Sequence, residues 1–391
     1  MSGHAQYTGG AVPAFMTLYV LTILLLLALS FLELNVVMSP SAKKALSLFV
    51  YLFLVLQAGL RWETGADWKA YLQHFQSINS LFSSASPTSL SPEYGYNIAV
   101  WAIKLVFSNY SAFLVIHAAV YYYLVFNSVR RYTGILFLPL MVFYCVTMGV
   151  TGSNRQLIAV AIGLYALRYI CEGRTIYFFL LVALACMFHN SAVILLLFPL
   201  FNRKINLAVL LLLLACSIWL GASQLPPLMF STVGNSLGEV EYYKVAAYLG
   251  SSKDSLLDSG LSILGLVKRL CLLTLFFYNR RSLGKKLRYY NVMLNAYIAG
   301  VVLYFLFANS LLIIVSRGDL YFNALEPLLL ASQVHLLPRR SARYVMASAL
   351  CVLSLCVLSF IFFFQSISPY PDLFLPYKGL IINTDYSRIL Y

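Results

Sequence analysis

The chain is dominated by long apolar stretches that are separated by short polar ones. A helix needs about 17–25 residues to cross the hydrocarbon core of a bilayer, and most of these stretches are that long. They cover residues 14–33, 45–60, 111–127, 134–150, 156–170, 205–222, 259–278, 291–315, 318–337 and 345–365. Backbone N–H and C=O groups cannot stay unpaired in lipid, so a spanning chain forms helices or a closed barrel. The stretches are continuous rather than alternating, which predicts an all-α bundle of transmembrane helices.

Two segments depart from this pattern. Residues 96–108 make only about 13 residues, too few to span, and Lys104 interrupts them, which predicts a re-entrant or interfacial helix on the outer side. Residues 175–202 contain a polar centre, Phe188-His189-Asn190-Ser191, which predicts a hairpin of two short helices with its tip outward. With these two choices the chain makes about twelve passes and forms one integral membrane domain, 1–391.

Basic residues lie in short loops on one side of the predicted bundle. The positive-inside rule assigns such loops to the cytoplasm. Both termini, the loops 61–95 and 223–258 and the tail 366–391 are then expected outside, and the Ser- and Pro-rich stretch 77–92 is expected to be a mobile loop. The first apolar segment lacks a basic leader and is expected to be a retained helix rather than a cleaved signal. The basic clusters are Lys43–Lys44, Arg130–Arg131, Arg168 with Arg174, Arg203–Lys204, the five cations between Arg280 and Arg288, and Arg339, Arg340 and Arg343.

Composition narrows the class of protein further. The chain is 61% hydrophobic and 10% charged, with a mean hydropathy of +0.82, whereas soluble domains average about 45–50% and 25%. The net charge of +14 is of the kind that nucleic-acid binding proteins have, but the basic residues lie in short loops, as the positive-inside rule expects. Nucleic acid is therefore not expected as a partner. The seven cysteines have neither metal-ligand nor paired spacing. Walker, dinucleotide, HExxH and CxxC motifs are absent, so any energy source is expected to arrive in an activated, membrane-borne substrate.

Polar residues of unusual kinds collect on the predicted outer side. Several stand at the mouths of apolar helices, where a charge is costly unless it faces a cavity or a partner. Arg155 and Arg317 are outer-side arginines that break the charge rule, and a guanidinium at a helix end is well suited to bind a phosphate. The group comprises Arg61, Trp62, Glu63, Asp67, Trp68, Tyr71, Glu93, Tyr94, Tyr96, Asn154, Arg155, Gln156, His189, Asn190, Arg317, Asp319, Tyr321, Pro376, Tyr377 and Lys378.

Structural roles are the alternative for each of these residues. Arg155 could pair with Asp67 or Glu93 simply to hold loops together, and Arg317 could pair locally with Asp319. These pairings and the phosphate-binding role are both open at this point.

His189 and the tryptophans have equally plain alternatives. A histidine on an apolar helix is more often a packed, hydrogen-bonded side chain than a catalyst. Trp62 and Trp68 are most simply interfacial anchors.

Several short motifs follow one another along the chain. They are Gly65-Ala66-Asp67-Trp68-Lys69-Ala70-Tyr71, Glu93-Tyr94-Gly95-Tyr96, Arg155-Gln156-Leu157-Ile158-Ala159, Phe188-His189-Asn190-Ser191-Ala192, Ser316-Arg317 with Tyr321-Phe322, and Pro376-Tyr377. In this order they resemble the EpsG family, which belongs to the Wzy-like bacterial polysaccharide polymerases. The resemblance covers about residues 60 to 378, and a Ser-rich insertion before Glu93 is its one departure.

The resemblance implies a GT-C-like enzyme of the bacterial inner membrane that works on the periplasmic side. Its substrates would be oligosaccharide repeat units on undecaprenyl pyrophosphate, and its product an exopolysaccharide, capsule or O-antigen. The implied partners are these lipid-linked oligosaccharides, the bilayer and a chain-length regulator, with no cofactor and no nucleic acid.

This chemistry suggests roles for the outer residues. Fixed cations stabilise the charge that develops on a leaving pyrophosphate, so Arg155 and Arg317 are expected there. His189 is the first choice for the base that deprotonates the acceptor hydroxyl, ahead of Asp67 and Glu93, because a carboxylate near two arginines is expected to be too acidic. No metal site is expected. The residues expected to bind substrate are Trp68, Tyr71, Tyr94, Gln156, Tyr321 and Tyr377.

Three rival functions stay open. An O-antigen ligase uses similar chemistry with a lipid A-core acceptor. A flippase for lipid-linked sugars would place its key charges at the middle of the bilayer and would show inverted repeats, and an acyltransferase would place its histidine on the cytosolic side.

Overall fold

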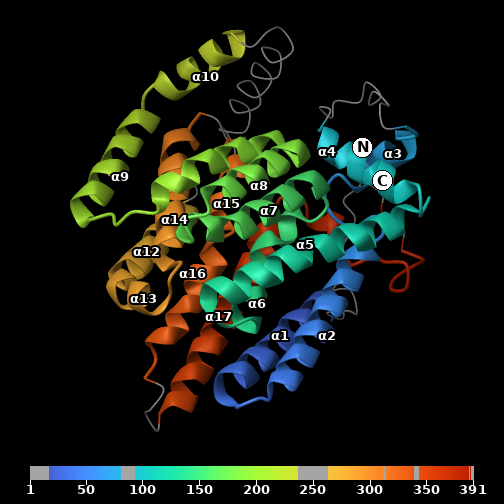
Figure 1. The fold of residues 1–391 in the computed structure, drawn as a ribbon, viewed down its shortest axis with the longest axis horizontal. Coiled ribbons are helices and arrows are strands. Elements are labelled where there is room, and N and C mark those ends of the chain that lie inside the picture. Colours follow the sequence, from blue (N-terminus) through green and yellow to red (C-terminus); the bar gives the residue numbers. More distant parts are fainter. Residues whose placement is uncertain are drawn as a thin grey trace, which may run out of the picture.

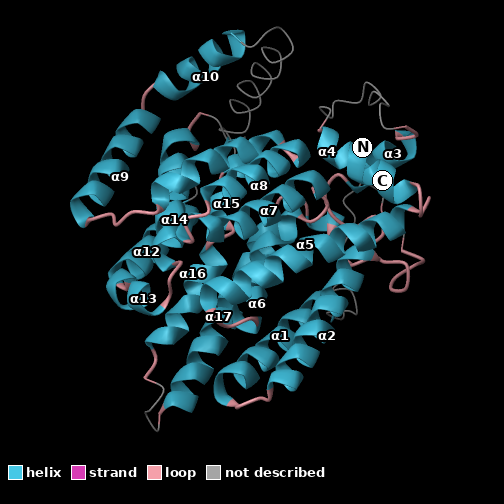
Figure 2. Ribbon diagram, in the orientation of Figure 1, coloured by secondary structure: helices cyan, strands magenta, loops and turns pink. Residues whose placement is uncertain are grey.

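The computed structural model describes residues 17–80, 93–236, 263–310, 314–338, 343–386 and 388. These residues are almost entirely helical and contain no β-strand, only one isolated bridge between Arg61 and Gly379 (Figure 2). The predicted all-α class is confirmed.

The elements are α1 (Thr17–Asn35), α2 (Pro40–Gly59), α3 (Trp68–Ser77), α4 (Tyr94–Lys104), α5 (Tyr110–Thr133), α6 (Phe137–Thr147), η2 (Met148–Val150), α7 (Asn154–Cys171), α8 (Thr175–Phe188), η3 (Asn190–Phe201), α9 (Leu207–Gly221), α10 (Leu225–Ser236), α12 (Ile263–Tyr278), α13 (Arg280–Lys286), α14 (Tyr290–Phe307), η4 (Ile314–Gly318), α15 (Leu320–Asn323), α16 (Glu326–Ser332), η5 (Gln333–Leu336), α17 (Tyr344–Ile367) and η6 (Pro371–Leu373).

Five helices in the described part of the chain are long and apolar enough to cross a membrane: α1, α2, α5, α14 and α17. Shorter apolar helices cover Phe137–Val150, Thr175–Phe188, Asn190–Phe201 and Leu207–Gly221. The chain is therefore a polytopic helical membrane protein, as predicted, while the count of about twelve passes stays a prediction.

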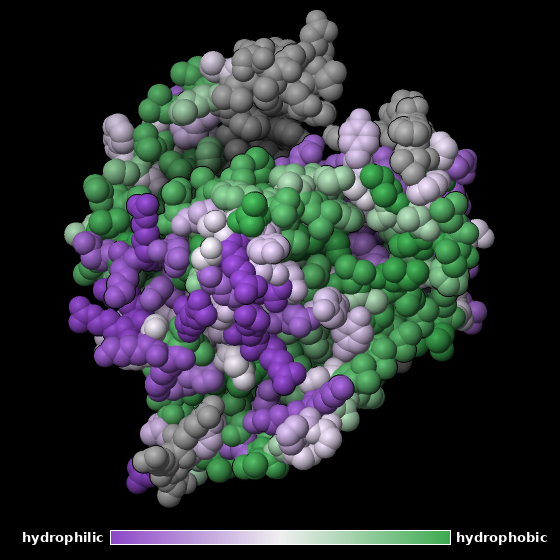
Figure 3. Space-filling model, viewed as in Figure 1, coloured by the Kyte–Doolittle hydropathy of each residue, from purple (hydrophilic) through white to green (hydrophobic). Residues whose placement is uncertain are grey.

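The surface is apolar over large areas. Leu52 on α2, Leu212 on α9 and Val357 on α17 are about half exposed or more, and Figure 3 shows hydrophobic side chains over a large part of one face. Soluble monomers rarely expose apolar patches of more than a few hundred Å². Lipid is the solvent that such a surface fits.

The centre of the bundle is formed by α6 and α7, which α5, α8, α16 and α17 surround (Figure 1). Phe137 to Cys145 of α6 are all buried, and α7 is buried over most of its length. From Arg155 to Arg168, α7 rises about 20 Å at 1.5 Å per residue. The helix therefore connects a polar group at one end of the bundle with the basic loops at the other.

The segment expected to be re-entrant or interfacial is the short helix α4, which has 11 residues. It contacts α5 and α8. The ammonium of Lys104 donates to the carbonyl oxygens of Phe75 at 2.9 Å and Ile78 at 2.7 Å, where the end of the α3 dipole favours a cation. The residue that interrupts the apolar run thus holds α3 and α4 together.

The predicted hairpin of two short helices is also present. The first arm, α8, ends at Phe188, and the second, η3, is a 3₁₀ helix that begins at Asn190. At 2.0 Å per residue η3 is about 24 Å long, longer than an α-helix with the same number of residues. The amide of Asn295 on α14 donates to the carbonyl oxygens of Phe201, at 2.7 Å, and Arg203, which fixes the far end of the hairpin.

The apolar stretch 318–337 is not one helix. It begins in the π turn η4 and continues as the short helices α15, α16 and η5. Two carboxylates explain the breaks: Asp319 and Glu326 turn toward α12 instead of continuing an apolar face. Parts of the loops 61–95 and 223–258 are helical, as α3 and α10, while residues 81–92 of the expected mobile loop and 237–258 of the second loop lie outside the described residues.

Two ion pairs join α12 to this broken segment. Lys268 lies 2.8 Å from Glu326, and Arg269 lies 3.6 Å from Asp319, whose side chain is fully buried. Asn323 also donates to Asp319 at 2.8 Å. Charges buried in a membrane protein are tolerated when they are paired in this way, so these pairs position α12 and the segment that begins with η4.

We predict that replacing Arg269 by Ala destabilises the protein by about 3–5 kcal/mol, because the Asp319 carboxylate is left buried without its partner. Thermal unfolding of the purified protein in detergent measures the effect. The double variant Arg269→Leu, Asp319→Leu should recover most of the loss, since it removes both charges. An Arg269→Ala variant with an unchanged Tm contradicts this account.

Candidate active site

Two glycines bring a distant loop onto the turn that precedes Arg155. Gly65 has φ +101° and Gly152 has φ +114°, conformations that suit glycine. The N–H of Ala66 donates to the carbonyl of Thr151 at 3.0 Å, and a Cβ on Gly152 would lie 1.9 Å from the carbonyl oxygen of Ala66. This contact sets α3, which begins two residues later, beside the start of α7.

Arg155, in the first turn of α7, is the centre of the site. Its Nη1 lies 3.0 Å from Oε2 of Glu93, and its Nε donates to the hydroxyl of Tyr71 at 3.2 Å. Both members of the ion pair are almost completely buried, with side chains 10% and 5% exposed. Of the two pairings open for Arg155 from the sequence, the structure has the one with Glu93.

Glu93 connects this arginine to the hairpin. Its second oxygen, Oε1, accepts the backbone N–H of Asn190 at 3.2 Å. Burial raises the pKa of Glu93 above its usual 4.5, although Arg155 and Arg317 both act to lower it. The expectation that a carboxylate near two arginines would be too acidic is therefore not met, because desolvation outweighs the two positive charges.

His189 lies at the tip of the hairpin, outside the membrane-spanning helices. Its Nδ1 accepts the backbone N–H of Ser191 at 3.3 Å and lies 2.6 Å from the Ser191 hydroxyl, which is 3.0 Å from the hydroxyl of Tyr321. A backbone N–H only donates, so Nδ1 carries a lone pair. The order of donation runs from Tyr321 to Ser191 to His189.

This arrangement decides the protonation state of His189. Burial, with Arg155 and Arg317, lowers the pKa of His189 from 6.5 to about 4. The ring is neutral at pH 7, and because Nδ1 is an acceptor, its proton is on Nε2. His189 therefore offers an N–H donor at Nε2, which does not suit the role of base that we expected from the sequence.

Arg317 differs from Arg155 in its surroundings. It lies in the π turn η4 and its side chain is exposed. The amide of Gln156 donates to the backbone carbonyl of Arg317 at 2.7 Å, so the residue after Arg155 holds η4 in place. Asp319 pairs with Arg269 and not with Arg317, and no described side chain engages the Arg317 guanidinium.

The other sequence-predicted residues lie around this group rather than in it. Trp68 is buried edge-on against Trp62 and Tyr110, with ring centroids at 4.7 and 5.7 Å. Tyr94, beside Glu93, is 68% exposed. Asp67 is exposed and its side chain does not cap α3.

Tyr377 belongs to a separate group. It is buried, donates to the carbonyl of Gln57 at 2.6 Å and packs against Tyr19. Lys378, the next residue, accepts from the N–H of Trp62 through its carbonyl at 2.9 Å. The tail is thus attached to the loop that leads to α3, and Tyr377 supports the site from a distance.

Sequence reasoning missed the contacts that hold the start of α7. Arg61 donates to the side chain of Asn154 at 2.7 Å, and His117 lies 2.9 Å from the backbone carbonyl of Asn154. Ser191 was part of a recognised motif but had no assigned role. Its position two residues after His189, with a hydroxyl, was the available signal.

Seven of the predicted residues therefore meet at one end of the bundle: Tyr71, Glu93, Arg155, Gln156, His189, Arg317 and Tyr321. They come from α3, the residue before α4, α7, the hairpin, η4 and α15. In Figure 1, α3 and α4 lie on the opposite side of the molecule from α12 and α13.

The fold and this site define a polytopic helical membrane protein with a buried ion pair and a hydroxyl–imidazole chain at one end. A model of the EpsG family matches residues 44–378, and the chain belongs to this family. Neither the comparison with curated proteins nor the one with solved structures gave a match. Family membership supports a polymerase-type function in exopolysaccharide synthesis.

We predict that His189 stays neutral, with its proton on Nε2, from pH 5 to pH 8, because its pKa is lowered to about 4. Nitrogen-15 NMR of histidine-labelled protein measures both properties, and a His189→Asn sample assigns the signal. Ser191→Ala should weaken the preference of His189 for the tautomer protonated at Nε2, because the hydroxyl that donates to Nδ1 is removed. A ring that titrates near pH 6.5, or one that is protonated at Nδ1, contradicts the assignment.

Proposed function

We propose that the chain is a polysaccharide polymerase that joins oligosaccharide repeat units carried on undecaprenyl pyrophosphate, on the periplasmic face of the inner membrane. The observation that carries the proposal is the convergence of Arg155, Glu93, His189 and Arg317 at one end of an EpsG-family bundle. The activated donor comes in the membrane, which agrees with the lack of a nucleotide motif.

The reaction requires a hydroxyl to replace a pyrophosphate. The oxygen of the acceptor sugar attacks the anomeric carbon of the donor glycan, and the bond from that carbon to the lipid pyrophosphate breaks. The leaving oxygen gains negative charge and the acceptor hydroxyl loses its proton. A cation for the first change and a base for the second are the groups that catalysis needs.

Arg317 supplies the cation in this proposal. Its side chain is exposed, whereas its backbone is held by Gln156. The guanidinium is therefore accessible to a ligand, and the backbone from which it projects is fixed in position. A planar fork of donors matches two phosphate oxygens. Arg155 contributes the electrostatic effect of its positive charge rather than a direct contact with the phosphate, since its own donors engage Glu93 and Tyr71.

Glu93 replaces His189 as the proposed base. Its raised pKa makes it a stronger base than an ordinary carboxylate, and a carboxylate that already accepts two contacts still has lone pairs for a hydroxyl. The Nε2–H of His189 donates to an oxygen of the substrate. Tyr94, exposed beside Glu93, offers a ring face to a sugar.

The genetic test is a strain that lacks this gene, restored with wild-type or variant copies. Deletion should leave single repeat units on their carrier or on the core, and the wild-type copy should restore the glycan ladder. Repeat units that accumulate on the cytoplasmic side would identify a flippase instead. Full-length polymer on the carrier that never reaches the core would identify a ligase.

We predict that Arg317→Ala lowers the rate of polymerisation by about 10²–10³, the usual cost of removing one donor from a developing oxyanion. Arg317→Lys should retain part of the rate, because it keeps the charge but loses the fork. The ladder and a rate measured on lipid-linked units report the effect. Lys44→Ala, an exposed cation at the other end of the bundle, is the control, and equal activity of Arg317→Ala and wild type refutes the role.

We predict a rate that falls on the acid side through the pKa of Glu93, above 4.5, because the base must be deprotonated to accept a proton. His189, with a pKa of about 4, should add no change near neutral pH. Glu93→Gln should be inactive at every pH, and Asp385→Asn, an exposed carboxylate, should match wild type. A Glu93→Gln enzyme with a normal rate excludes this base.

A further inference from the structure

A hollow of about 400 Å³ lies at the other end of the bundle, away from Arg155. It is formed by the loop that joins η3 to α9, by the junction of α12 with α13, and by the first turns of α14. Five cationic side chains line it: Arg203, Lys204, Arg280, Arg281 and Lys285. Figure 3 shows hydrophilic side chains gathered over α12 and α13 on this face.

The walls of this hollow are fixed by contacts of their own. Asn295 holds the carbonyl oxygens of Phe201 and Arg203, which keeps the loop above α14. Arg280 stacks on the ring of Phe277 at 3.6 Å and donates to its carbonyl oxygen at 2.8 Å. Leu283 is fully buried and anchors α13. The cations are therefore brought together from two segments, the loop after η3 and α13, before any ligand arrives.

The charge in this hollow is not balanced by the protein. No carboxylate lines it among the residues that the structure describes. Burial lowers the pKa of Arg280, and repulsion by the neighbouring Arg281 lowers it further. An anion bound between them would relieve this repulsion.

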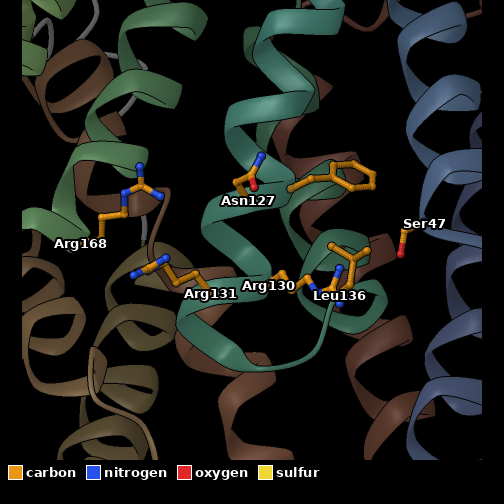
Figure 4. Close-up of a pocket in the computed structure, with 7 residues that line it drawn as sticks. Ser47, Asn127, Arg130, Arg131, Leu136 and Arg168 are labelled. Atoms are coloured by element: carbon orange, nitrogen blue, oxygen red, sulfur yellow. The ribbon is translucent and has the colours of Figure 1, made fainter. Parts of the chain in front are cut away.

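A second basic hollow has three arginines, one of which pairs with a carboxylate. The pocket in Figure 4 has about 350 Å³ and is lined by Arg130, Arg131 and Arg168, together with Ser47, Phe126, Asn127 and Leu136. There Arg131 pairs with Glu172 at 2.6 Å and also contacts Tyr289. Arg168 stacks on Tyr165 at 3.7 Å and donates to Tyr169 at 2.7 Å.

The positive-inside rule explains why both hollows are basic, but it does not explain the difference between them. The rule needs cations in loops; it does not need five of them around one cavity without an acid. Basic pockets between membrane helices are suited to phosphate head groups, and arginine forks bind phosphate oxygens in pairs.

We propose that the hollow lined by Arg203, Lys204, Arg280, Arg281 and Lys285 is a phosphate-binding site, separate from the site around Arg155. Its ligand is a group with more than one negative charge, either the head group of an anionic lipid or a soluble phosphate compound. The site is independent of which transfer reaction takes place at the other end.

The test compares two triple variants of the full-length protein. Arg280→Gln, Arg281→Gln, Lys285→Gln removes three charges from this hollow, and Lys43→Gln, Lys44→Gln, Arg130→Gln removes three exposed charges from α2 and α5 at the basic end. Inorganic pyrophosphate binding is measured by calorimetry. Retention of phosphatidic acid is measured by native mass spectrometry on protein purified from mixed phosphatidic acid and phosphatidylcholine micelles.

We expect the first triple variant to lose at least about tenfold in binding of one probe, the size of change that removal of several phosphate contacts produces, and the second to bind like wild type. Loss of pyrophosphate binding identifies a soluble ligand, and loss of retained phosphatidic acid alone identifies a lipid. Arg280→Lys with Arg281→Lys should keep most of the binding, which separates charge from folding. Equal loss in both triple variants, or wild-type protein that binds neither probe, overturns the proposal.

Discussion

The ion pair between Arg155 and Glu93 is the contact on which the polar end of this bundle depends. Each partner is buried, and a buried charge without its partner is costly, so each fixes the other. Arg155 begins α7 and Glu93 precedes α4, while the second oxygen of Glu93 holds the hairpin at Asn190. Three segments from distant parts of the chain are thereby placed within reach of one another, and His189 and Arg317 take their positions around them.

The two ends of the bundle also differ in how their charged residues are arranged. Among the described residues, the end with Arg155 combines the buried pair of Arg155 and Glu93 with the exposed Arg317, whereas the other end collects cations. Between the two, α12 brings Lys268 and Arg269 into the apolar region, where Glu326 and Asp319 meet them. The same segment that carries Asp319 carries Arg317, so the ion pair inside the bundle also anchors the turn that presents the exposed guanidinium.

Much of this architecture could be predicted from the sequence. Long apolar runs determine spanning helices through length alone, and Lys104 and the polar residues after Phe188 marked the short helix and the hairpin. The stretch 318–337 was harder, because Asp319 and Glu326 look like isolated charges until α12 supplies their partners. The meeting of Arg155 with Glu93 was one of two pairings that the sequence left open. The protonation of His189 could not be predicted, since it depends on the hydroxyl of Ser191 and on the field of two arginines that are distant in sequence.

The most direct test of the central claim is a transfer assay with the purified protein in vesicles and purified lipid-linked repeat units, with no other protein and no nucleotide. The account predicts products of two and more repeat units on one carrier, with one undecaprenyl pyrophosphate released for each bond formed, and it predicts that Arg155→Ala abolishes both. Repeat units that change leaflet but never grow, or polymer made equally well without Arg155, would contradict it.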